Sequence, residues 1–271
     1  MNLKKSYAEK YGYQRVITDR NSVLTYEEID MLKLADGKSY TGIERDKECC
    51  LIVLAGTCSV KGDDFVFENV GQRATPFDGP AEGVYIGRDT AFTVTATGGD
   101  GRICVATAPA VKTTAPYKIA AADIATKTRG QGPFERLAAF NLDESRAAEM
   151  LYIGEFWVED GNWASYPPHK HDVDDMPVEG ALDEVYYFEF DRPQGFGFQA
   201  VYSKEGDIDK AYCVRTGDFV EVPKGYHPCS AAPGYKCYCL WIMAGKNRGL
   251  FSTTQEEHKW INSEYTPKGG K

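Results

Sequence analysis

Residues 166–171, Tyr-Pro-Pro-His-Lys-His, open the segment from which the fold of the chain can be recognised. This stretch runs from Gly161 to Ala231 and contains three of the four histidines of the chain. Alternate side chains of an extended strand point to the same side, so His169 and His171 are expected to project together. Two neighbouring imidazoles form half of a metal site, which a carboxylate and a third imidazole from other strands would complete.

Glu184 and His227 are the candidates for these two remaining ligands. Glu184 begins the apolar run 185–190, whose pattern predicts a buried strand. A carboxylate at the start of a buried strand is costly unless something pairs with it. His227 lies in a Pro-x-Gly turn after the alternating segment 219–222. The sequence therefore predicts a site for one divalent cation; the competing interpretation is that each histidine is an ordinary hydrogen-bonded side chain.

Two segments of this stretch resemble the motifs of the cupin superfamily. Segment 217–227 resembles the second cupin motif, with its histidine one residue early, and segment 161–184 resembles the first motif. Residues 172–183 lengthen the usual spacing between the second histidine and the glutamate. The chain resembles the 5-deoxy-glucuronate isomerases of bacterial myo-inositol catabolism in this long spacer and in the strings Glu-Val-Tyr-Tyr-Phe, Pro-Gln-Gly-Phe-Gly-Phe-Gln and Pro-Lys-Gly-Tyr-His-Pro. The resemblance is densest over residues 150–245.

The expected fold class is all-β, with two jelly-roll-like cupin barrels in one chain. Strands of alternating pattern, separated by turns rich in Gly, Pro and Asp, are typical of such barrels. We expect an N-terminal lobe over residues 1–111 and a linker with a short helical segment, residues 143–150, over 112–150. A metal-binding lobe is then expected over 151–250, and a C-terminal helix and tail over 251–271.

The two halves of the chain align with each other, which indicates an internal repeat. Segments 48–53 and 84–88 align with segments 184–189 and 220–224 at one common offset. The first half has other residues at the histidine positions, namely Ile43, Arg45 and Ala91, and only Glu48 remains as a match. We therefore expect the first lobe to hold no metal. A chance similarity between two β-rich halves is the alternative.

The resemblance implies an aldose–ketose isomerisation of 5-deoxy-glucuronate to 2-deoxy-5-keto-gluconate. The cofactor expected is one divalent metal ion, zinc or manganese, which stabilises the oxygens of an enediolate. A base must also move a proton between adjacent carbons. The candidates are Tyr186, on the strand face of Glu184, Glu189, on the other face, and a metal-bound hydroxide; the sequence leaves the choice open.

The substrate carboxylate requires a cation, and three basic residues flank the motifs: Lys170, Arg192 and Lys224. Gln199 is a candidate hydrogen-bond partner for a sugar hydroxyl. For each of these residues an ordinary surface or core role is the alternative. Segment 172–183 is expected to be either a lid over the barrel mouth or a solvated loop.

Composition excludes several other classes of protein. With 31 Lys and Arg against 40 Asp and Glu among 271 residues, the formal charge of −9 argues against nucleic-acid binding. No apolar run reaches the ~20 residues of a membrane span, and the N-terminus lacks an apolar signal core, so we expect a cytoplasmic location. The eight cysteines are then expected to be reduced, with a thiolate site at Cys237 and Cys239 as the weaker alternative.

Other functions remain open at this point. An Fe(II) cupin dioxygenase uses similar ligands, and a related cupin isomerase acts on the uronate from pectin breakdown, although that family has a shorter spacer. A non-catalytic sugar-binding cupin is the third alternative. The expected partner is a small uronate substrate, and the chain is a possible homo-oligomer.

Overall fold

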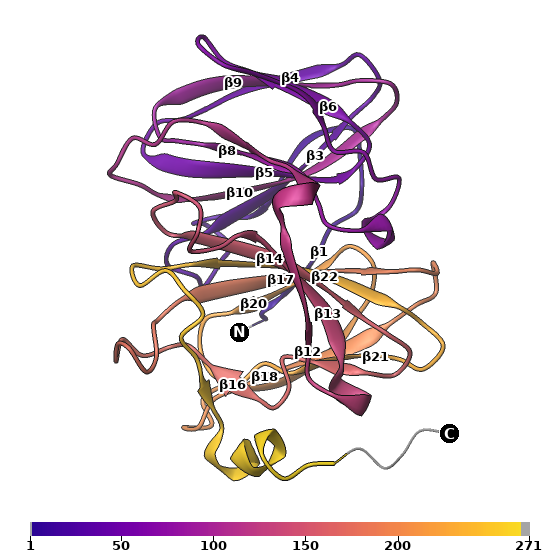
Figure 1. The fold of residues 1–271 in the computed structure, drawn as a ribbon, viewed down its shortest axis with the longest axis vertical. Coiled ribbons are helices and arrows are strands. Elements are labelled where there is room, and N and C mark those ends of the chain that lie inside the picture. The colour runs from indigo at the N-terminus through magenta and orange to yellow at the C-terminus, as the bar shows by residue number, and fades with distance from the viewer. Residues whose placement is uncertain (1, 267–271) are drawn as a thin grey trace.

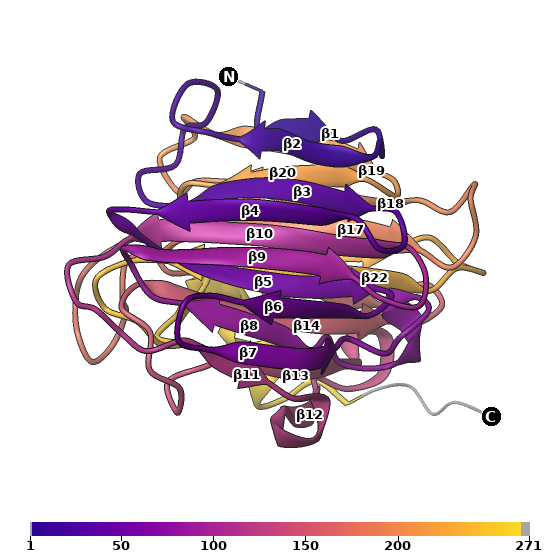
Figure 2. The same cartoon turned by 90° about the horizontal axis from the view of Figure 1, so that it is seen from above.

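The computed structural model describes residues 2–266, which form strands and, over that range, four short 3₁₀-helices. Figure 1 shows two stacked lobes, the N-terminal lobe above and the C-terminal lobe below. In the view from above, the strands of both lobes run across the molecule in nearly the same direction (Figure 2). The fold is the all-β, two-lobed cupin architecture that the sequence predicts.

In the first lobe a six-stranded sheet, β11-β8-β5-β10-β3-β2, packs against a four-stranded sheet, β4-β9-β6-β7. Apolar side chains such as Leu51, Val84 and Phe92 fill the space between the two sheets. The elements are β2 (Gly12–Ile17), β3 (Glu28–Leu34), β4 (Ser39–Glu44), β5 (Lys47–Ala55), β6 (Cys58–Lys61), β7 (Val66–Val70), η1 (Pro76–Asp78), β8 (Gly83–Ile86), β9 (Thr90–Ala96), β10 (Gly101–Pro109) and β11 (Tyr117–Ile119).

The second lobe contains a seven-stranded sheet, β1-β20-β17-β22-β14-β13-β12, a four-stranded sheet, β15-β21-β18-β19, and the pair β16-β23. Its elements are β1 (Lys4–Ser6), η2 (Ala121–Asp123), β12 (Ala125–Arg129), η3 (Gly132–Phe134), β13 (Arg136–Leu142), β14 (Leu151–Val158), β15 (Trp163–Ala164), β16 (His169–Lys170), β17 (Asp183–Phe190), β18 (Gly197–Tyr202), β19 (Asp209–Val214), β20 (Asp218–Val222), β21 (Cys229–Ala231), β22 (Cys237–Ala244), β23 (Thr253–Thr254) and η4 (Glu256–Asn262).

The segment expected to be a linker is divided between the lobes: β11 extends the large sheet of the first lobe, and β12 and β13 extend that of the second. Residues 143–150 form turns and bends, so the expected helix is wrong. The Asp143 carboxylate accepts the N–H of Ser145, and the N–H groups of Glu149 and Met150 go to the buried carboxylate of Glu48. Side-chain carboxylates thus accept the hydrogen bonds of backbone N–H groups that an α-helix would use for its own backbone bonds. The C-terminal helix does form, as the 3₁₀-helix η4, and the tail from residue 267 lies outside the described residues.

The internal repeat exists at the level of strands. Strands β8-β5-β10-β3-β2 follow the same order in the first lobe as β20-β17-β22-β14-β13 in the second. The residue-level match of Glu48 with Glu184 is wrong by one position. Cys49 pairs with Ile86 as Glu184 pairs with Val222, and Cys49 faces the interior of its barrel. A shift of one residue turns a side chain to the other face of a strand, so Glu48 faces the second lobe instead.

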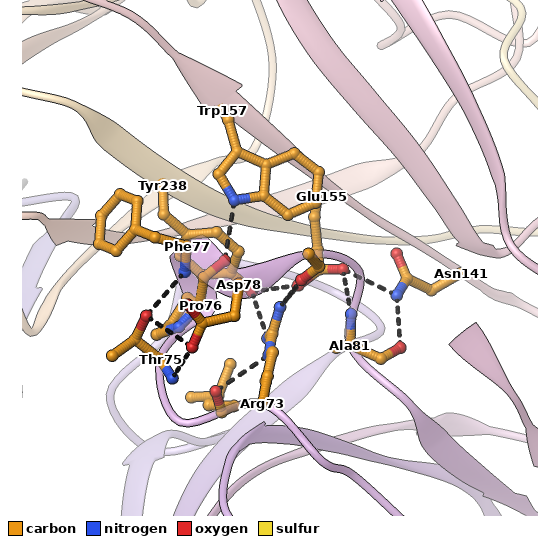
Figure 3. Close-up of polar contacts among 12 residues, drawn as sticks. Arg73, Thr75, Pro76, Phe77, Asp78, Ala81, Asn141, Glu155, Trp157 and Tyr238 are labelled. Atoms are coloured by element: carbon orange, nitrogen blue, oxygen red, sulfur yellow. Dashed lines mark hydrogen bonds and ion pairs between the residues drawn. The ribbon is translucent and has the colours of Figure 1, made fainter. Parts of the chain in front are cut away.

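The two lobes are joined through their large sheets, whose facing side chains form one apolar core. A buried polar network lies within this interface (Figure 3). Glu155 of β14 accepts hydrogen bonds from Arg73 (2.7 Å), Tyr238 (2.6 Å), the N–H of Ala81 (2.7 Å) and Asn141 (2.9 Å). Because these donors compensate the buried charge, the network fixes how the two lobes sit against each other.

None of the helices within residues 2–266 has the length and apolar character that crossing a membrane needs. The eight cysteines are all free. Cys237 and Cys239 are buried in β22, and in the described part of the chain they belong to no cluster of metal-ligand type.

Candidate metal centre

Four side chains from three segments of the second lobe meet at one end of its barrel. His169 lies on β16 and His171 directly after it, Glu184 lies near the start of β17, and His227 lies between β20 and β21. One ligand atom each from His171, Glu184 and His227 lies within 4.8 Å of the others. The His169 ring flanks this group, with its centroid 4.9 Å from that of His227. The segments singled out in the sequence therefore converge in space.

Backbone carbonyls fix the orientation of all three imidazoles. The Nδ1 atoms lie near the carbonyl oxygens of Pro167 for His169 (3.3 Å), Leu182 for His171 (3.0 Å) and Gly225 for His227 (2.9 Å). A carbonyl only accepts, so each Nδ1 carries the hydrogen and each neutral ring keeps a lone pair on Nε2. This is the arrangement by which proteins orient histidine ligands of metals.

The inner nitrogens crowd one carboxylate oxygen. Nε2 of His171 and Nε2 of His227 lie 3.0 and 3.2 Å from Oε2 of Glu184. Nε2 of His227 is buried without a hydrogen bond, because that contact lacks the alignment. Lone pairs of neutral imidazoles facing a carboxylate repel each other unless a proton or a cation lies between them. The donor set therefore fits a cation of the kind that imidazole and carboxylate bind together.

The electrostatics of the cluster reflect its burial. Burial raises the pKa of Glu184, although His171 opposes the shift. Burial, followed by the charges of His169 and His171, lowers the pKa of His227 well below its usual range, and burial lowers that of His169 to about 4. At His171 burial also acts to lower the pKa, but the bond and charge of Glu184 outweigh it and raise the pKa overall. Two of the three rings are thus neutral near pH 7, the form that binds metals.

A cavity of about 360 Å³ opens beside this cluster and is lined on one side by His169, Glu184 and Tyr186. Tyr186 lies on the face of Glu184, as expected, and its hydroxyl is 2.5 Å from Oγ of Ser165. Burial raises the pKa of Tyr186 well above its usual range, so this side chain is a phenol that can donate a hydrogen bond.

The other predicted site residues lie outside the cavity lining. Glu189 faces the first lobe, where it accepts a hydrogen bond from Tyr187 (2.8 Å) and pairs with Arg102 (2.9 Å). Glu189 therefore lies on the other side of the sheet from Glu184, as its position on β17 predicts. Gln199 is buried and donates a hydrogen bond to the carbonyl of His227 (2.6 Å). It therefore supports the loop that carries His227 and is not accessible to a sugar hydroxyl.

The three candidate carboxylate-binding cations are also placed elsewhere. Lys170 pairs with Asp172 (2.5 Å) and Glu179 (2.7 Å), Arg192 is exposed, and Lys224 pairs with Asp207 (2.7 Å) on the surface. Segment 172–183 folds around Glu179, and none of its residues lines the cavity. The lid interpretation is therefore not supported.

Two groups of residues that line the cavity were not predicted from the sequence. Arg129 and Arg136 enter it from β12 and β13, in the segment expected to be a linker. Ser252, Thr254 and Asn262 enter it from the C-terminal segment. No sequence motif surrounds the two arginines, so only the register of β12 and β13 could have identified them as cavity residues.

Comparisons with known proteins agree with this arrangement. The chain matches the model of the KduI/IolB family over residues 2–261. A protein of Bacillus subtilis (strain 168) named 5-deoxy-glucuronate isomerase is 39% identical over 247 residues, covering 90% of this chain and 91% of that protein. A protein of the same name from Shouchella clausii is 42% identical over 218 residues, 80% of each chain.

Solved structures show the same relationship. An IolB-like protein from Salmonella typhimurium LT2 superposes with a TM-score of 0.93 at 36% identity, covering 97% of this chain and 100% of that one. An oxalate decarboxylase from Lactobacillus farciminis superposes with a TM-score of 0.68 at 10% identity, covering 95% and 89%, a likeness that shows the fold alone. Because it matches the family model over nearly its whole length and is 39% identical to a curated relative, the chain belongs to the KduI/IolB family.

Proposed function

We propose that this chain is a metal-dependent aldose–ketose isomerase that converts 5-deoxy-glucuronate to 2-deoxy-5-keto-gluconate, as a cytoplasmic step of myo-inositol breakdown. The observation that carries the proposal is the set of imidazoles whose Nδ1 atoms are held by carbonyls, so that Nε2 of His171 and His227 meet Glu184 beside a cavity. The relatives named 5-deoxy-glucuronate isomerase support the choice of substrate.

The residues proposed to hold one zinc or manganese ion are His169, His171, Glu184 and His227. When bound, such an ion supplies positive charge that stabilises the oxygens on the two carbons between which the carbonyl moves. The phenol of Tyr186 faces the same cavity and is proposed to donate a hydrogen bond to one of these oxygens. Phe156 packs edge-on against the Tyr186 ring (5.8 Å between centroids) and helps to hold it in place.

The test is turnover by the purified protein loaded with zinc or with manganese. We expect NMR to show 5-deoxy-glucuronate converted to 2-deoxy-5-keto-gluconate, at the same rate with and without oxygen. Loss of turnover under anaerobic conditions would favour an iron dioxygenase. A metal-loaded protein that binds the uronate without converting it would contradict the proposal and favour a sugar-binding role.

A further inference from the structure

Arg129 and Arg136 form a pair of like charges on one wall of the cavity. The two residues lie directly opposite each other on the antiparallel strands β12 and β13. Directly opposite residues project from the same face, and both of these side chains line the cavity. Like charges in this position destabilise a sheet unless an opposite charge lies near them.

No acidic side chain within residues 2–266 forms an ion pair with either guanidinium. Arg136 donates only from Nη1, to the carbonyls of Phe134 (3.2 Å) and Tyr166 (3.3 Å), and Arg129 lies over the ring of Phe140 at 5.5 Å. No acceptor in the described part of the chain takes the hydrogens on Nε and Nη2 of Arg136. The two carbonyls thus fix the guanidinium while leaving most of its donors available.

This lack of acidic partners contrasts with other arginines in the same molecule. Arg136 is half-buried and Arg129 is exposed. Arg73 and Arg102 are largely buried, and each pairs with a glutamate, at 2.7 and 2.9 Å. The chain has a formal charge of −9, so carboxylates are abundant. A half-buried cation next to a second cation, with donors that no acceptor of the described chain takes, favours an anion from outside the chain.

We propose that Arg136, assisted by Arg129, binds the carboxylate of the substrate, while the aldehyde end faces His169, Glu184 and Tyr186. The inference rests on the proposed function and extends it to a residue outside the cupin motifs. A guanidinium presents paired N–H donors in the geometry of a carboxylate, so one arginine can hold it through two parallel bonds. The shared cavity of about 360 Å³ lies in the range of pockets that enclose small molecules.

The first measurement is the KM for 5-deoxy-glucuronate of metal-loaded Arg136→Gln and Arg136→Lys. We expect KM to rise on the order of 10- to 100-fold for the glutamine variant, and less for the lysine variant, which keeps the charge but loses the fork. Bound metal stays as in the unmodified protein. Arg192→Gln, which removes an exposed arginine outside the cavity, is the control and leaves KM unchanged. An unchanged KM in Arg136→Gln overturns the inference.

The second measurement does not depend on turnover. NMR titration compares D-glucuronate with D-glucose, which lacks the carboxylate, on the unmodified protein and on Arg136→Gln. We expect the unmodified protein to prefer the acid and the variant to bind both sugars equally. A preference that survives in the variant, or is absent from the unmodified protein, overturns the inference. Failure of isomerisation with the preference intact would contradict the proposed function alone.

Discussion

Nε2 of His171 lies 3.0 Å from Oε2 of Glu184, while Nδ1 of the same ring lies 3.0 Å from the carbonyl of Leu182. The backbone carbonyl thus orients the imidazole, and its other nitrogen faces a buried acid, with which a proton or a cation between the two would join it. Leu182 and Glu184 are two residues apart, so one short segment at the start of β17 sets both the orientation of the ring and its partner.

Replacing any of the three clustered histidines is expected to remove the metal. His169→Ala, His171→Ala and His227→Ala should each lower the metal content well below that of the unmodified protein. Isomerisation should fall by more than about 100-fold, since loss of an outer partner alone costs about 10- to 100-fold. Metal analysis and NMR turnover measure the two effects. His258→Ala, on η4, is the matched control and should change neither. Full turnover by a metal-free variant would rule out this role.

Tyr186→Phe is expected to lower kcat by about 100-fold or more, the usual effect of removing a donor that faces developing charge. Metal content should not change, because the proposed ligands are intact. Tyr187→Phe is a matched control from the next position on β17, whose hydroxyl bonds Glu189 on the opposite face. That variant should lose stability and keep its kcat. Equal kcat values for the two variants would argue against a role for Tyr186 in the reaction.

Gln199→Leu is expected to weaken metal binding by about 10- to 100-fold, because Gln199 holds the carbonyl of His227 at 2.6 Å. Competition with a chelator of known affinity measures the change. Activity should return when excess metal is supplied, which distinguishes a positioning residue from a ligand. Unchanged affinity in the variant would mean that the loop keeps its shape without this bond.

Arg73→Met is expected to reduce the free energy of unfolding by about 3–5 kcal/mol, because it leaves the Glu155 carboxylate buried without its cation. Urea unfolding measures the loss. Lys236→Gln removes an exposed ion pair with Glu159 and should cost less than about 1 kcal/mol. Adding Glu155→Leu to Arg73→Met should recover part of the loss. Similar small losses for both ion pairs would show that the buried network contributes little.

The carboxyl group of Glu27 is expected to make the free energy of unfolding depend on pH. It is buried, and neither carboxyl oxygen has a hydrogen-bond partner. Burial, and then the charge of Asp183, raises its pKa well above the usual range. A carboxyl with a raised pKa in the folded state contributes a cost that is absent below the unfolded pKa of about 4.3 and grows as pH rises above it.

Glu27→Gln should therefore stabilise the protein by about 1–3 kcal/mol at pH 8 and by less at pH 5. Urea unfolding of both proteins at the two pH values tests the sign. Asp36→Asn, on the turn after β3, serves as a comparison for an exposed acid. A gain that is the same at both pH values would contradict the assignment to Glu27.

The cupin fold and the convergence of the candidate metal ligands could be predicted because their signals are local. The histidines and Glu184 lie in short segments whose alternation and turns can be recognised without knowing the rest of the molecule. The opposite orientations of Tyr186 and Glu189 also follow from strand periodicity alone.

Most of the wrong predictions concern residues whose contacts come from another part of the folded chain. Residues 143–150 read as a helix, but Glu48, about a hundred residues earlier, takes their N–H groups. Lys170 and Lys224 were expected to be available cations, yet acids of neighbouring loops, Glu179 and Asp207, pair with them. Arg136 lines the cavity only because β13 pairs with β12 and β14, a register that no local pattern reveals.

The pairing of β1 with β20 has a consequence for the order in which the protein is made. Residues 4–6 leave the ribosome well before residues 218–220, with which they pair, and the N–H of Leu3 donates to Tyr212 across 209 residues. The first lobe can close during synthesis, whereas β1 belongs to the second lobe and waits for a sheet that does not yet exist. One edge of the large sheet of the second lobe is thus completed by a segment that is synthesised long before its partner strand β20.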